Sequence, residues 1–382
     1  MLRKGTFILM KTKIQDMTSG SPGRLIILFA IPLMLGNICQ QLYTMVDTMV
    51  VGQVAGVEAL AALGAVDFLM WVVTGISTGL TQGFSIQLSQ YYGAKDFENL
   101  RKSLAHSYRL TAFIAAGVLI LSQSFASLVL TGLHTPSNII GMSLLYLRII
   151  FCGIPATAAY NMFASALRAM GNSKTPLTAM IIASVLNVSL DILFVAGFGW
   201  GVAGAAIATV IAQSFSAVYC FLILRRIDIV HLTRADFMPA SGMNARLMKL
   251  GIPVVFQNII IGVGGLVVQY VINGYGFLFV AGFTATNKLY GLLEMAAISY
   301  GYAIVTYVGQ NLGAGKIDRI RKGVRSSMLL SLLTSLIISA AMFLFGKNIL
   351  SLFISGEPQQ TQQVLAIAFK YLSIMAAMLW VL

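Results

Sequence analysis

Long apolar runs follow one another along this chain and restrict its fold more than any other feature. Each run holds about 20 residues or more, enough for an α-helix to cross a hydrocarbon core of about 30 Å. The runs are continuous and not alternating, which favours helices over barrel strands. We therefore expect an all-α membrane protein with ten transmembrane helices, at residues 25–50, 57–91, 104–130, 139–167, 176–196, 202–224, 246–273, 277–309, 323–345 and 362–382.

Composition excludes a soluble protein. Hydrophobic residues make up 58% of the chain and charged residues 10%, whereas soluble domains carry about 25% charged residues. The net charge of +13 would suit a nucleic-acid-binding protein only if basic residues covered one folded face. Here they stand in short clusters between the apolar runs. We therefore expect the lipid bilayer, and no nucleic acid, as a partner.

The positions of the basic residues predict the orientation of the chain. With a cytoplasmic N-terminus the inner segments, with their flanking turns, contain all but four of the 25 Lys and Arg residues; they are 1–24, 92–103, 168–175, 225–245 and 310–322. Cytoplasmic loops of membrane proteins are enriched in Lys and Arg. We therefore predict a cytoplasmic N-terminus, and this orientation accounts for the net charge without an anionic partner.

An internal repeat divides the chain into two lobes. Short motifs recur in the same order roughly 220 residues later, and such repeats are typical of secondary transporters. The matching pairs are Ile31-Pro32 with Ile252-Pro253, Asn37 with Asn258, Gln90 with Gln310, and Gly93-Ala94 with Gly313-Ala314. The repeating unit has six helices, so both copies keep the same orientation and the symmetry axis should run along the membrane normal.

The repeat also predicts the domain organisation. We expect an N-terminal cytoplasmic segment at 1–24, a first six-helix lobe at 25–224, a cytoplasmic linker at 225–245, and a second lobe with four helices at 246–382. The second lobe is two helices short and the chain stops within an apolar run. We therefore expect the sequence to be a fragment at its C-terminal end, and Met17 resembles a natural start.

Ionisable residues within membrane helices cost about 2.5–3.5 kcal/mol each on insertion scales and are functional candidates by default. Asp47 lies in the first apolar run, and Asn187 and Asp191 stand four residues apart on one face of the fifth helix. Asn161 and Thr209 are further polar residues in apolar surroundings. If these five converge, their oxygens suit a shared proton or Na⁺ held at Asp47 and Asp191.

Asp47 also has a plainer interpretation, as a hydrated structural residue near the outer end of its helix. The repeat aligns it with Val268 in the second lobe. Ion coupling would therefore belong to the first lobe alone.

A second group of residues could line the substrate cleft or latch the lobes. Asp67 matches Asn287 in the repeat, and Lys288 follows directly, so an Asp67–Lys288 pair could hold one state. The alternative places the two groups in separate hydrated regions. Glu294 could meet a cationic substrate or form a structural hydrogen bond, and Gln257 is a polar candidate in the seventh helix.

The sequence contains no complete motif for ATP use or for enzymatic catalysis. It has no GxxxxGK[ST] and no HExxH, and its one GxSxG match, at residues 75–79, lies inside a continuous apolar run and not at a strand-to-helix turn. Its three cysteines and three histidines are scattered, with no CxxC and no histidine cluster. We expect neither an enzyme nor a resident cofactor, and no disulfide or metal site at the cysteines.

Several motifs together resemble those of the multidrug and toxic compound extrusion (MATE) transporters, closest to the bacterial DinF-like branch. The resemblance covers residues 17–382. It rests on Ala30-Ile31-Pro32, Val46-Asp47-Thr48 up to Gly52, the segment from Gln90 to Ala94, the segment from Ala166 to Asn172, Asn187 with Asp191, and the segment from Gly201 to Thr209.

This resemblance implies twelve helices in two six-helix lobes that form a V. It implies export of small organic substrates, cationic amphiphiles in particular, in exchange for H⁺ or Na⁺, by a monomer in the bacterial plasma membrane. The cation site of the family maps onto Asp47, Asn161, Asn187, Asp191 and Thr209. Some members carry an acid in helix 7, where this chain has Gln257 and Gln269, so we expect no second-lobe Na⁺ site of that kind.

Other functions remain open from the sequence. A flippase for lipid-linked saccharides, of the same superfamily, is the main alternative, although such proteins often carry cationic residues in the cleft and the helix interiors here are poor in Lys and Arg. A receptor would more usually lack a two-lobe repeat. A channel would not need a paired acid cluster.

Overall fold

The computed structural model describes residues 14–133, 135–275, 277–351 and 358–381, and in these it is built from helices. The first lobe contains α1 (Pro22–Val54), α2 (Val57–Gly93), α3 (Phe97–Gly132), α4 (Ile140–Cys152), α5 (Ile154–Ala169), α6 (Lys174–Asp191), η1 (Ile192–Gly197) and α7 (Gly201–Leu224). The linker holds η2 (Asp228–Val230) and η3 (Arg234–Phe237). The second lobe contains α8 (Met243–Asn273), α9 (Phe277–Gly313), α10 (Ile317–Ser351), α11 (Pro358–Met378) and η4 (Leu379–Val381).

Eight of the described helices are long and apolar enough to cross a membrane, and the number is ten when each of two bent pairs is counted as one span. The predicted runs therefore correspond to ten spans in the described part of the chain. The run predicted at 139–167 is bent by 45° between α4 and α5, where Gly153 and Pro155 interrupt the helix. Exposed side chains such as Phe113, Ile260 and Leu344 give the bundle the apolar exterior that lipid requires.

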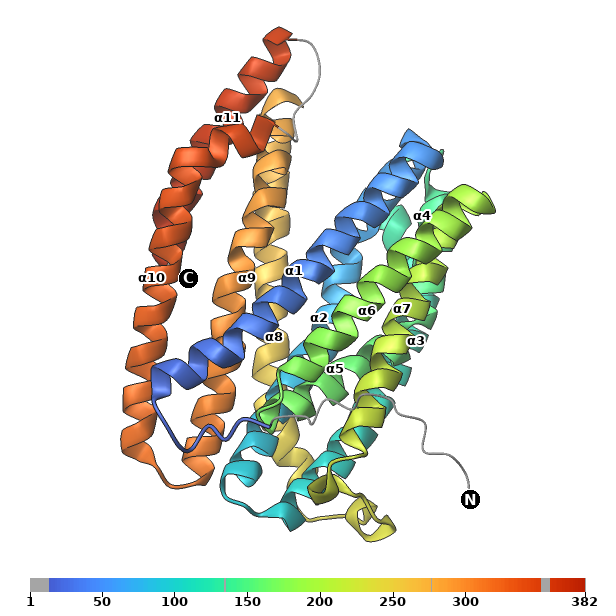
Figure 1. Cartoon of the computed structure of the whole chain (residues 1–382). Coiled ribbons are helices and arrows are strands. Elements are labelled where there is room, and N and C mark those ends of the chain that lie inside the picture. Colours follow the sequence, from blue (N-terminus) through green and yellow to red (C-terminus); the bar gives the residue numbers. More distant parts are fainter. Residues whose placement is uncertain (1–13, 134, 276, 352–357, 382) are drawn as a thin grey trace, which may run out of the picture.

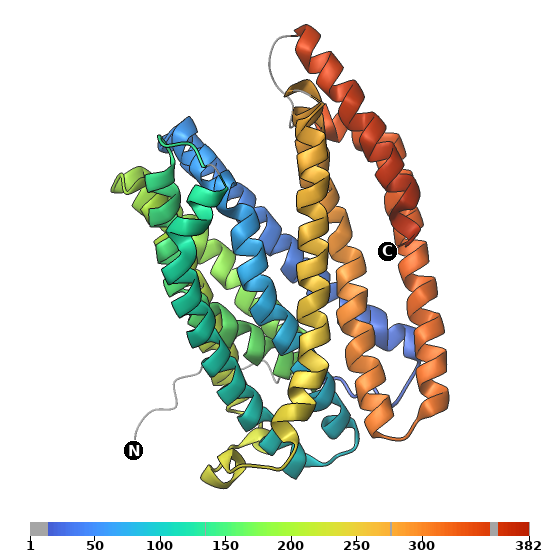
Figure 2. The same ribbon diagram turned by 180° about the vertical axis from the view of Figure 1, so that it is seen from behind.

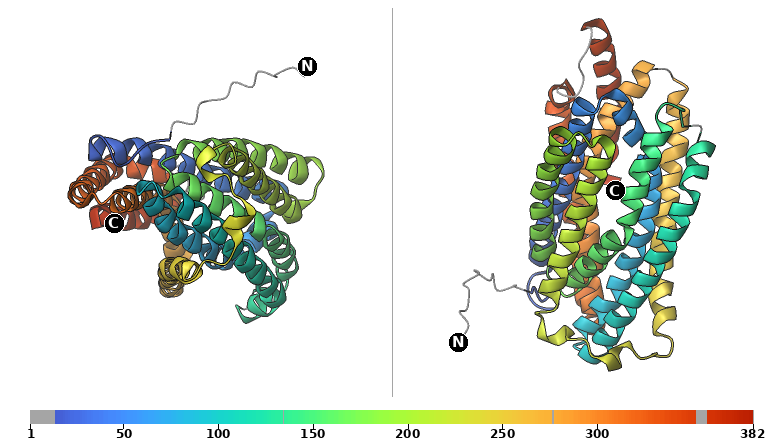
Figure 3. Two further views of the ribbon diagram at one scale, coloured as in Figure 1. Left: turned by 90° about the horizontal axis from the view of Figure 1, so that it is seen from below. Right: turned by 90° about the vertical axis from the view of Figure 1, so that its right-hand side faces the viewer.

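The two lobes lie together at one end of the molecule and diverge toward the other, which gives the V shape that the family resemblance implies (Figure 1; Figure 2, seen from behind). The joined end carries the loops and helix ends at 92–103, 168–175, 225–249 and 316–325, and we call it the basic end. Figure 3 shows the same end from below, with α8 beside the first lobe.

A row of glycines allows a close helix contact between the lobes. Gly75, Gly79 and Gly83 recur every four residues on α2, so they share one face, and this face packs against α8. A Cβ on Gly79 would lie 2.9 Å from the backbone of Val255, and one on Gly83 would overlap the backbone of Gly251. Small residues at this spacing let helix backbones approach closely within membranes.

The two copies of the repeated Gln–Gly motif contact each other reciprocally. A Cβ on Gly93 would overlap the Gln310 backbone, and a Cβ on Gly313 would overlap the Gln90 backbone. Gly93 is equivalent to Gly313 in the repeat, and Gln90 to Gln310, so the same contact occurs twice with the lobes exchanged. Such a reciprocal contact indicates a two-fold axis. Here the axis relates the two lobes and passes through the basic end, in agreement with the expected repeat.

Residues 14–21, which we call the N-terminal strap, connect both lobes at the basic end. The Gln15 N–H donates to the Gly171 carbonyl of the first lobe (3.1 Å). The Met17 N–H donates to Gln310 Oε1 (3.1 Å), and Asn311 Nδ2 donates to the Met17 carbonyl (2.9 Å). Met17 is fully buried. Residues 1–13 of the predicted N-terminal segment lie outside the described residues.

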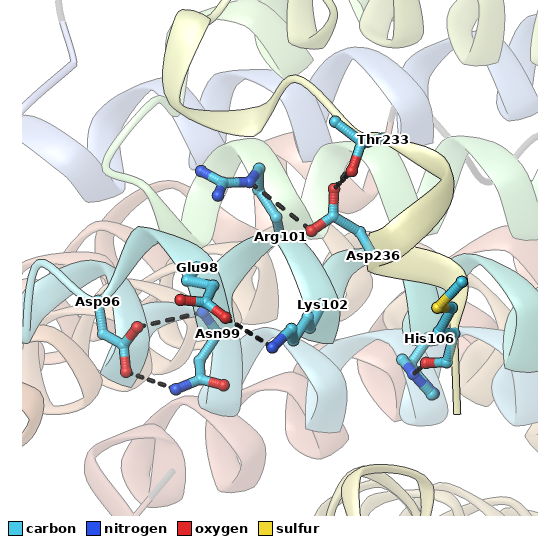
Figure 4. A network of polar contacts seen from close by, with 9 residues as sticks. Asp96, Glu98, Asn99, Arg101, Lys102, His106, Thr233 and Asp236 are labelled. Carbon is cyan, nitrogen blue, oxygen red and sulfur yellow. Dashed lines mark hydrogen bonds and ion pairs between the residues drawn. The ribbon is translucent and has the colours of Figure 1, made fainter. Parts of the chain in front are cut away.

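The linker between the lobes rests on the beginning of α3 (Figure 4). Arg101 Nε lies 3.7 Å from Asp236 Oδ1, and the Thr233 N–H and hydroxyl both donate to Asp236 Oδ2 (2.7 and 2.8 Å). One His106 ring nitrogen lies 2.7 Å from Asn244 Oδ1, and the other lies 3.0 Å from a backbone carbonyl of the linker. These contacts hold the linker in one position against the first lobe.

Candidate cation and substrate site

A polar cavity of about 340 Å³ lies within the first lobe, between α1, α2, α4, α5 and α7. Asp47, Asn161 and Thr209 line it. On the side of the second lobe it is bounded by Tyr302 of α9. A cavity of this size is within the range of about 300–1,000 Å³ that is common for small-molecule sites.

Three helices present pairs of polar residues spaced four apart toward this region, so each pair shares a helix face. The pairs are Tyr43 and Asp47 on α1, Asn187 and Asp191 on α6, and Thr209 and Gln213 on α7. Gln213 Nε2 donates to the Tyr43 hydroxyl at 3.2 Å. Asn187 Nδ2 donates to Thr209 Oγ1 at 3.4 Å. The hydrogen bonds therefore join the three helices at one point.

Several acceptor oxygens at this point are buried without a hydrogen-bond partner among the described residues. They are Asp47 Oδ1, Asn187 Oδ1, both Asp191 carboxylate oxygens and Gln213 Oε1. A buried polar atom without a partner costs about 1–3 kcal/mol, so native structures rarely leave one unsatisfied. These are all acceptors, and each needs a donor or a cation. The arrangement suits a bound proton or Na⁺, which prefers such oxygen ligands.

The two carboxylates stand close to each other in this apolar interior. Asp47 is 5% exposed and Asp191 is fully buried, and they are near enough to interact electrostatically. Neither forms an ion pair with a basic side chain among the described residues. Two buried like charges repel and cannot both remain ionised without compensation. A cation that enters from solution would provide that compensation.

The backbone after Asp191 departs from a regular helix. Asp191 is the last residue of α6, and the chain continues as the π-helical segment η1. Gly204 of α7 packs here, since a Cβ on it would lie 3.0 Å from Phe194 of η1. Wide helical turns of this kind occur frequently at functional sites, and this one begins directly after the buried acid.

The structure brings four of the five predicted cation residues together, namely Asp47, Asn187, Asp191 and Thr209. Asn161 lines the same cavity but donates through Nδ2 to Thr78 Oγ1 of α2 (3.2 Å). Its side chain is therefore bonded to α2 and not to the group around Asp191. The prediction that these residues bind the cation stays a prediction.

The second predicted group is more dispersed. Asp67 is exposed on α2 and close enough to Asp47 to interact with it electrostatically. Glu294 on α9 is half-buried and Gln257 on α8 is exposed, and neither lines the cavity. The side chain of Lys288 lies outside the described residues, so the Asp67–Lys288 latch stays a prediction, and the side chain of Gln269 lies outside them as well.

The structure adds site residues that the sequence analysis did not select. Tyr43 and Gln213 line the cavity beside the cation residues, and their spacing of four from Asp47 and Thr209 was a signal that could have found them. Arg168, which the sequence assigns to an inner loop, also lines the cavity. Its Nη2 donates to Ser165 Oγ (2.9 Å), and its Cζ lies 5.1 Å from the ring centroid of Tyr302. This cation–π contact joins the lobes at the base of the cavity.

Comparison with known protein families finds a match over most of the chain. The MatE family model matches residues 32–193 and 253–382. The two matched segments begin at Pro32 and Pro253, the proline pair of the internal repeat. This chain belongs to the MatE family.

Relatives and solved structures of the family cover most of the chain. It is 31% identical to the probable multidrug resistance protein YpnP of Bacillus subtilis, over 91% of this chain and 77% of that protein. It is 21% identical to the multidrug export protein MepA of Staphylococcus aureus, over 86% of this chain and 73% of that protein. An outward-facing structure of a multidrug resistance MATE transporter superposes with a TM-score of 0.89 at 22% identity, over 97% of this chain and 82% of that one.

Proposed function

We propose that this MatE family member exports small organic molecules, with cationic amphiphiles among them, by antiport against H⁺ or Na⁺. The relatives named above support the substrate class, since they are described as multidrug resistance and multidrug export proteins. The observation that carries the cation coupling is the group of buried, unpartnered acceptor oxygens on Asp47, Asn187, Asp191 and Gln213.

The exchange would follow alternating access by the two lobes. With the N-terminus cytoplasmic in the bacterial plasma membrane, the basic end faces the cytoplasm. The joined basic end then corresponds to a state that is closed inside and open outside. In this state a cation from outside binds Asp47 and Asp191, and the substrate leaves. Because Asp47 lies on α1, which contacts both lobes, loading this carboxylate changes how α1 packs and favours the return to the inward-open state.

The gradient of the coupling ion and the membrane potential supply the driving force. Each positive charge that moves inward gains about 2.3 kcal/mol per 100 mV, and every 1.4 kcal/mol is a factor of ten in an equilibrium. For an uncharged substrate, one coupled charge at 100 mV therefore sustains a substrate gradient of roughly fiftyfold. A monovalent cationic substrate exchanged one for one moves no net charge, so the concentration gradient of H⁺ or Na⁺ drives its export. No bound nucleotide is needed for this.

The test is transport of a fluorescent lipophilic cation by everted membrane vesicles, in which export appears as uptake into the vesicle. The vesicles contain the protein expressed from its full-length gene. A pH gradient and a Na⁺ gradient are imposed separately on wild type, Asp47→Asn and Asp191→Asn. We expect one gradient to drive transport by the wild type and neither to drive it in the variants. Glu58→Gln is the matched control, because Glu58 is an exposed carboxylate at the far end of α2. Gradient-driven transport by both variants would refute the coupling role.

Vesicles with correctly inserted wild-type protein but no gradient-driven efflux would point instead to the flippase alternative. The next substrates to test would then be lipid-linked saccharides.

A further inference from the structure

A second cavity lies in the first lobe, on the other side of α5 from the polar cavity at Asp47, which we call the transport cavity. Its volume is about 390 Å³, and it lies between α3, α5 and α7. Ala112, Leu119, Pro155 and Phe163 are among its apolar walls. The residues of α5 that line it differ from those that line the transport cavity, so α5 separates the two spaces.

A smaller cavity of about 260 Å³ adjoins this one at the basic end. Tyr108 and Phe221 line both, so the two spaces adjoin at these side chains. The smaller cavity is further lined by Arg225 and His231, where α7 passes into the linker. The combined site therefore has a long apolar part at membrane depth and a basic part at the membrane surface.

We propose that these joined cavities bind one anionic glycerophospholipid from the leaflet at the basic end, with an acyl chain in the apolar cavity and the phosphate beside Arg225 and His231. No Asp or Glu lines either cavity. Arg225 forms no ion pair with a described residue, and its Cζ lies 5.6 Å from the Phe221 ring centroid. Basic pockets between transmembrane helices at the cytoplasmic side are suited to anionic lipid headgroups.

A buried hydroxyl fits the glycerol region of such a lipid. Thr111 lines the apolar cavity three residues beyond Tyr108 and is 8% exposed. Its Oγ1 has no hydrogen-bond partner among the described residues. An acyl ester carbonyl is an acceptor without a donor of its own, so it is the complementary group for this hydroxyl.

The basic part of the site is formed before a lipid arrives. Phe237 of the linker is one of its walls, and Arg109 Nη1 of α3 donates to the Phe237 carbonyl (2.9 Å). The Arg101–Asp236 and His106 contacts hold the same linker segment on α3 (Figure 4). A lipid in this place would contact α3, the end of α7 and the linker, which is the connection between the moving lobes.

The choice of an anionic lipid over other occupants rests on charge and shape together. A zwitterionic lipid brings a second positive group toward Arg225, which lowers the electrostatic gain. A free phosphate ion would use the basic cavity but leave the apolar one without an occupant, and a neutral hydrocarbon would do the reverse.

The test is native mass spectrometry of the intact purified protein with phosphatidylglycerol, phosphatidylcholine or glycerol 3-phosphate. We expect the wild type to retain one phosphatidylglycerol in preference to phosphatidylcholine. Arg225→Gln should weaken this retention at least about fivefold, the factor that corresponds to about 1 kcal/mol for one basic group near a lipid surface. Arg226→Gln is the matched control, because Arg226 is exposed, adjacent and outside the cavity.

A second variant tests the apolar part separately. Ala112→Trp should fill the cavity and reduce phosphatidylglycerol retention while every basic residue remains in place. Equal retention of both lipids by the wild type, or equal losses in Arg225→Gln and Arg226→Gln, would overturn the proposal. Retention of glycerol 3-phosphate as strong as that of phosphatidylglycerol would also overturn it, in favour of a free-anion site.

Discussion

The glycine contact between α2 and α8 allows a quantitative test of how the lobes close. In the substitution Gly83→Ala, the new Cβ would lie 2.6 Å from the Leu250 carbonyl oxygen and from the Gly251 nitrogen. Ordinary contact begins at 3.4 Å. Both neighbours are backbone atoms, so no side chain can rotate away, and the helices must move apart by at least about 0.8 Å.

The energetic cost of this overlap falls on one conformation. Overpacking by a methyl group typically costs about 1–3 kcal/mol. In alternating access the basic end opens and α2 separates from α8, so the open state does not carry this cost. A difference of about 1–3 kcal/mol changes the ratio of the two states about 5- to 150-fold, in favour of the state that is open at the basic end.

The assay is a distance measurement by double electron–electron resonance with spin labels at Glu98 and Lys322, which are exposed at the basic ends of α3 and α10. Cys39, Cys152 and Cys220 are replaced first. We expect the population at long distance to rise in Gly83→Ala. Gly64→Ala is the control on the same helix, because a Cβ there has nothing within 4 Å. An unchanged distance distribution in a folded Gly83→Ala protein would show that the α2–α8 contact at Gly83 does not separate when the basic end opens.

Three further predictions concern the strap and the cation site. Gln310→Ala leaves the buried Met17 N–H without its acceptor, at a cost of about 1–3 kcal/mol, so the same spin-label pair should report more of the open state. Gln213→Leu removes one unpartnered oxygen but leaves both acids, so half-saturation of transport should need a higher concentration of the coupling ion, which vesicle efflux measures. Burial raises the pKa of Asp16, but hydrogen bonds from Thr18 and Ser19 and the charge of Lys316 outweigh it and hold the pKa below the ordinary value. The strap turn should thus keep its contribution to stability at neutral pH and lose it only as the pH falls below the ordinary aspartate range, as hydrogen exchange of the Thr18 amide would show.

The helices could be predicted from the sequence because hydropathy is a local property that needs no knowledge of packing. All ten apolar runs correspond to described spans, and the proline pair of the repeat begins both family matches. The bend between α4 and α5 was not predicted, although Gly153 and Pro155 stand at the break. Its position depends on α7, since a Cβ on Gly153 would lie 2.6 Å from Val210, and such a contact between distant segments has no local signal.

The candidate site could be predicted in part for the same reason. Asn187 and Asp191 share a face by their spacing, and the acids stood out against apolar neighbours. Arg168 was assigned to a loop because it stands beside other basic segments, whereas its contact with Tyr302 exists only when the lobes pack. The spacing of four between Gly75, Gly79 and Gly83 can be recognised in the sequence, but only the fold shows that these glycines face α8.

We propose that the coupling cation binds at the unpartnered oxygens of the first lobe and exchanges with substrate. The most direct test measures ion release when a lipophilic cation is added to the purified protein, as a pH change in weakly buffered solution or as a signal from a Na⁺ electrode. We expect the wild type to release one of these ions and the Asp47→Asn, Asp191→Asn double variant to release none. Undiminished release from a folded double variant that still binds substrate would contradict this proposal.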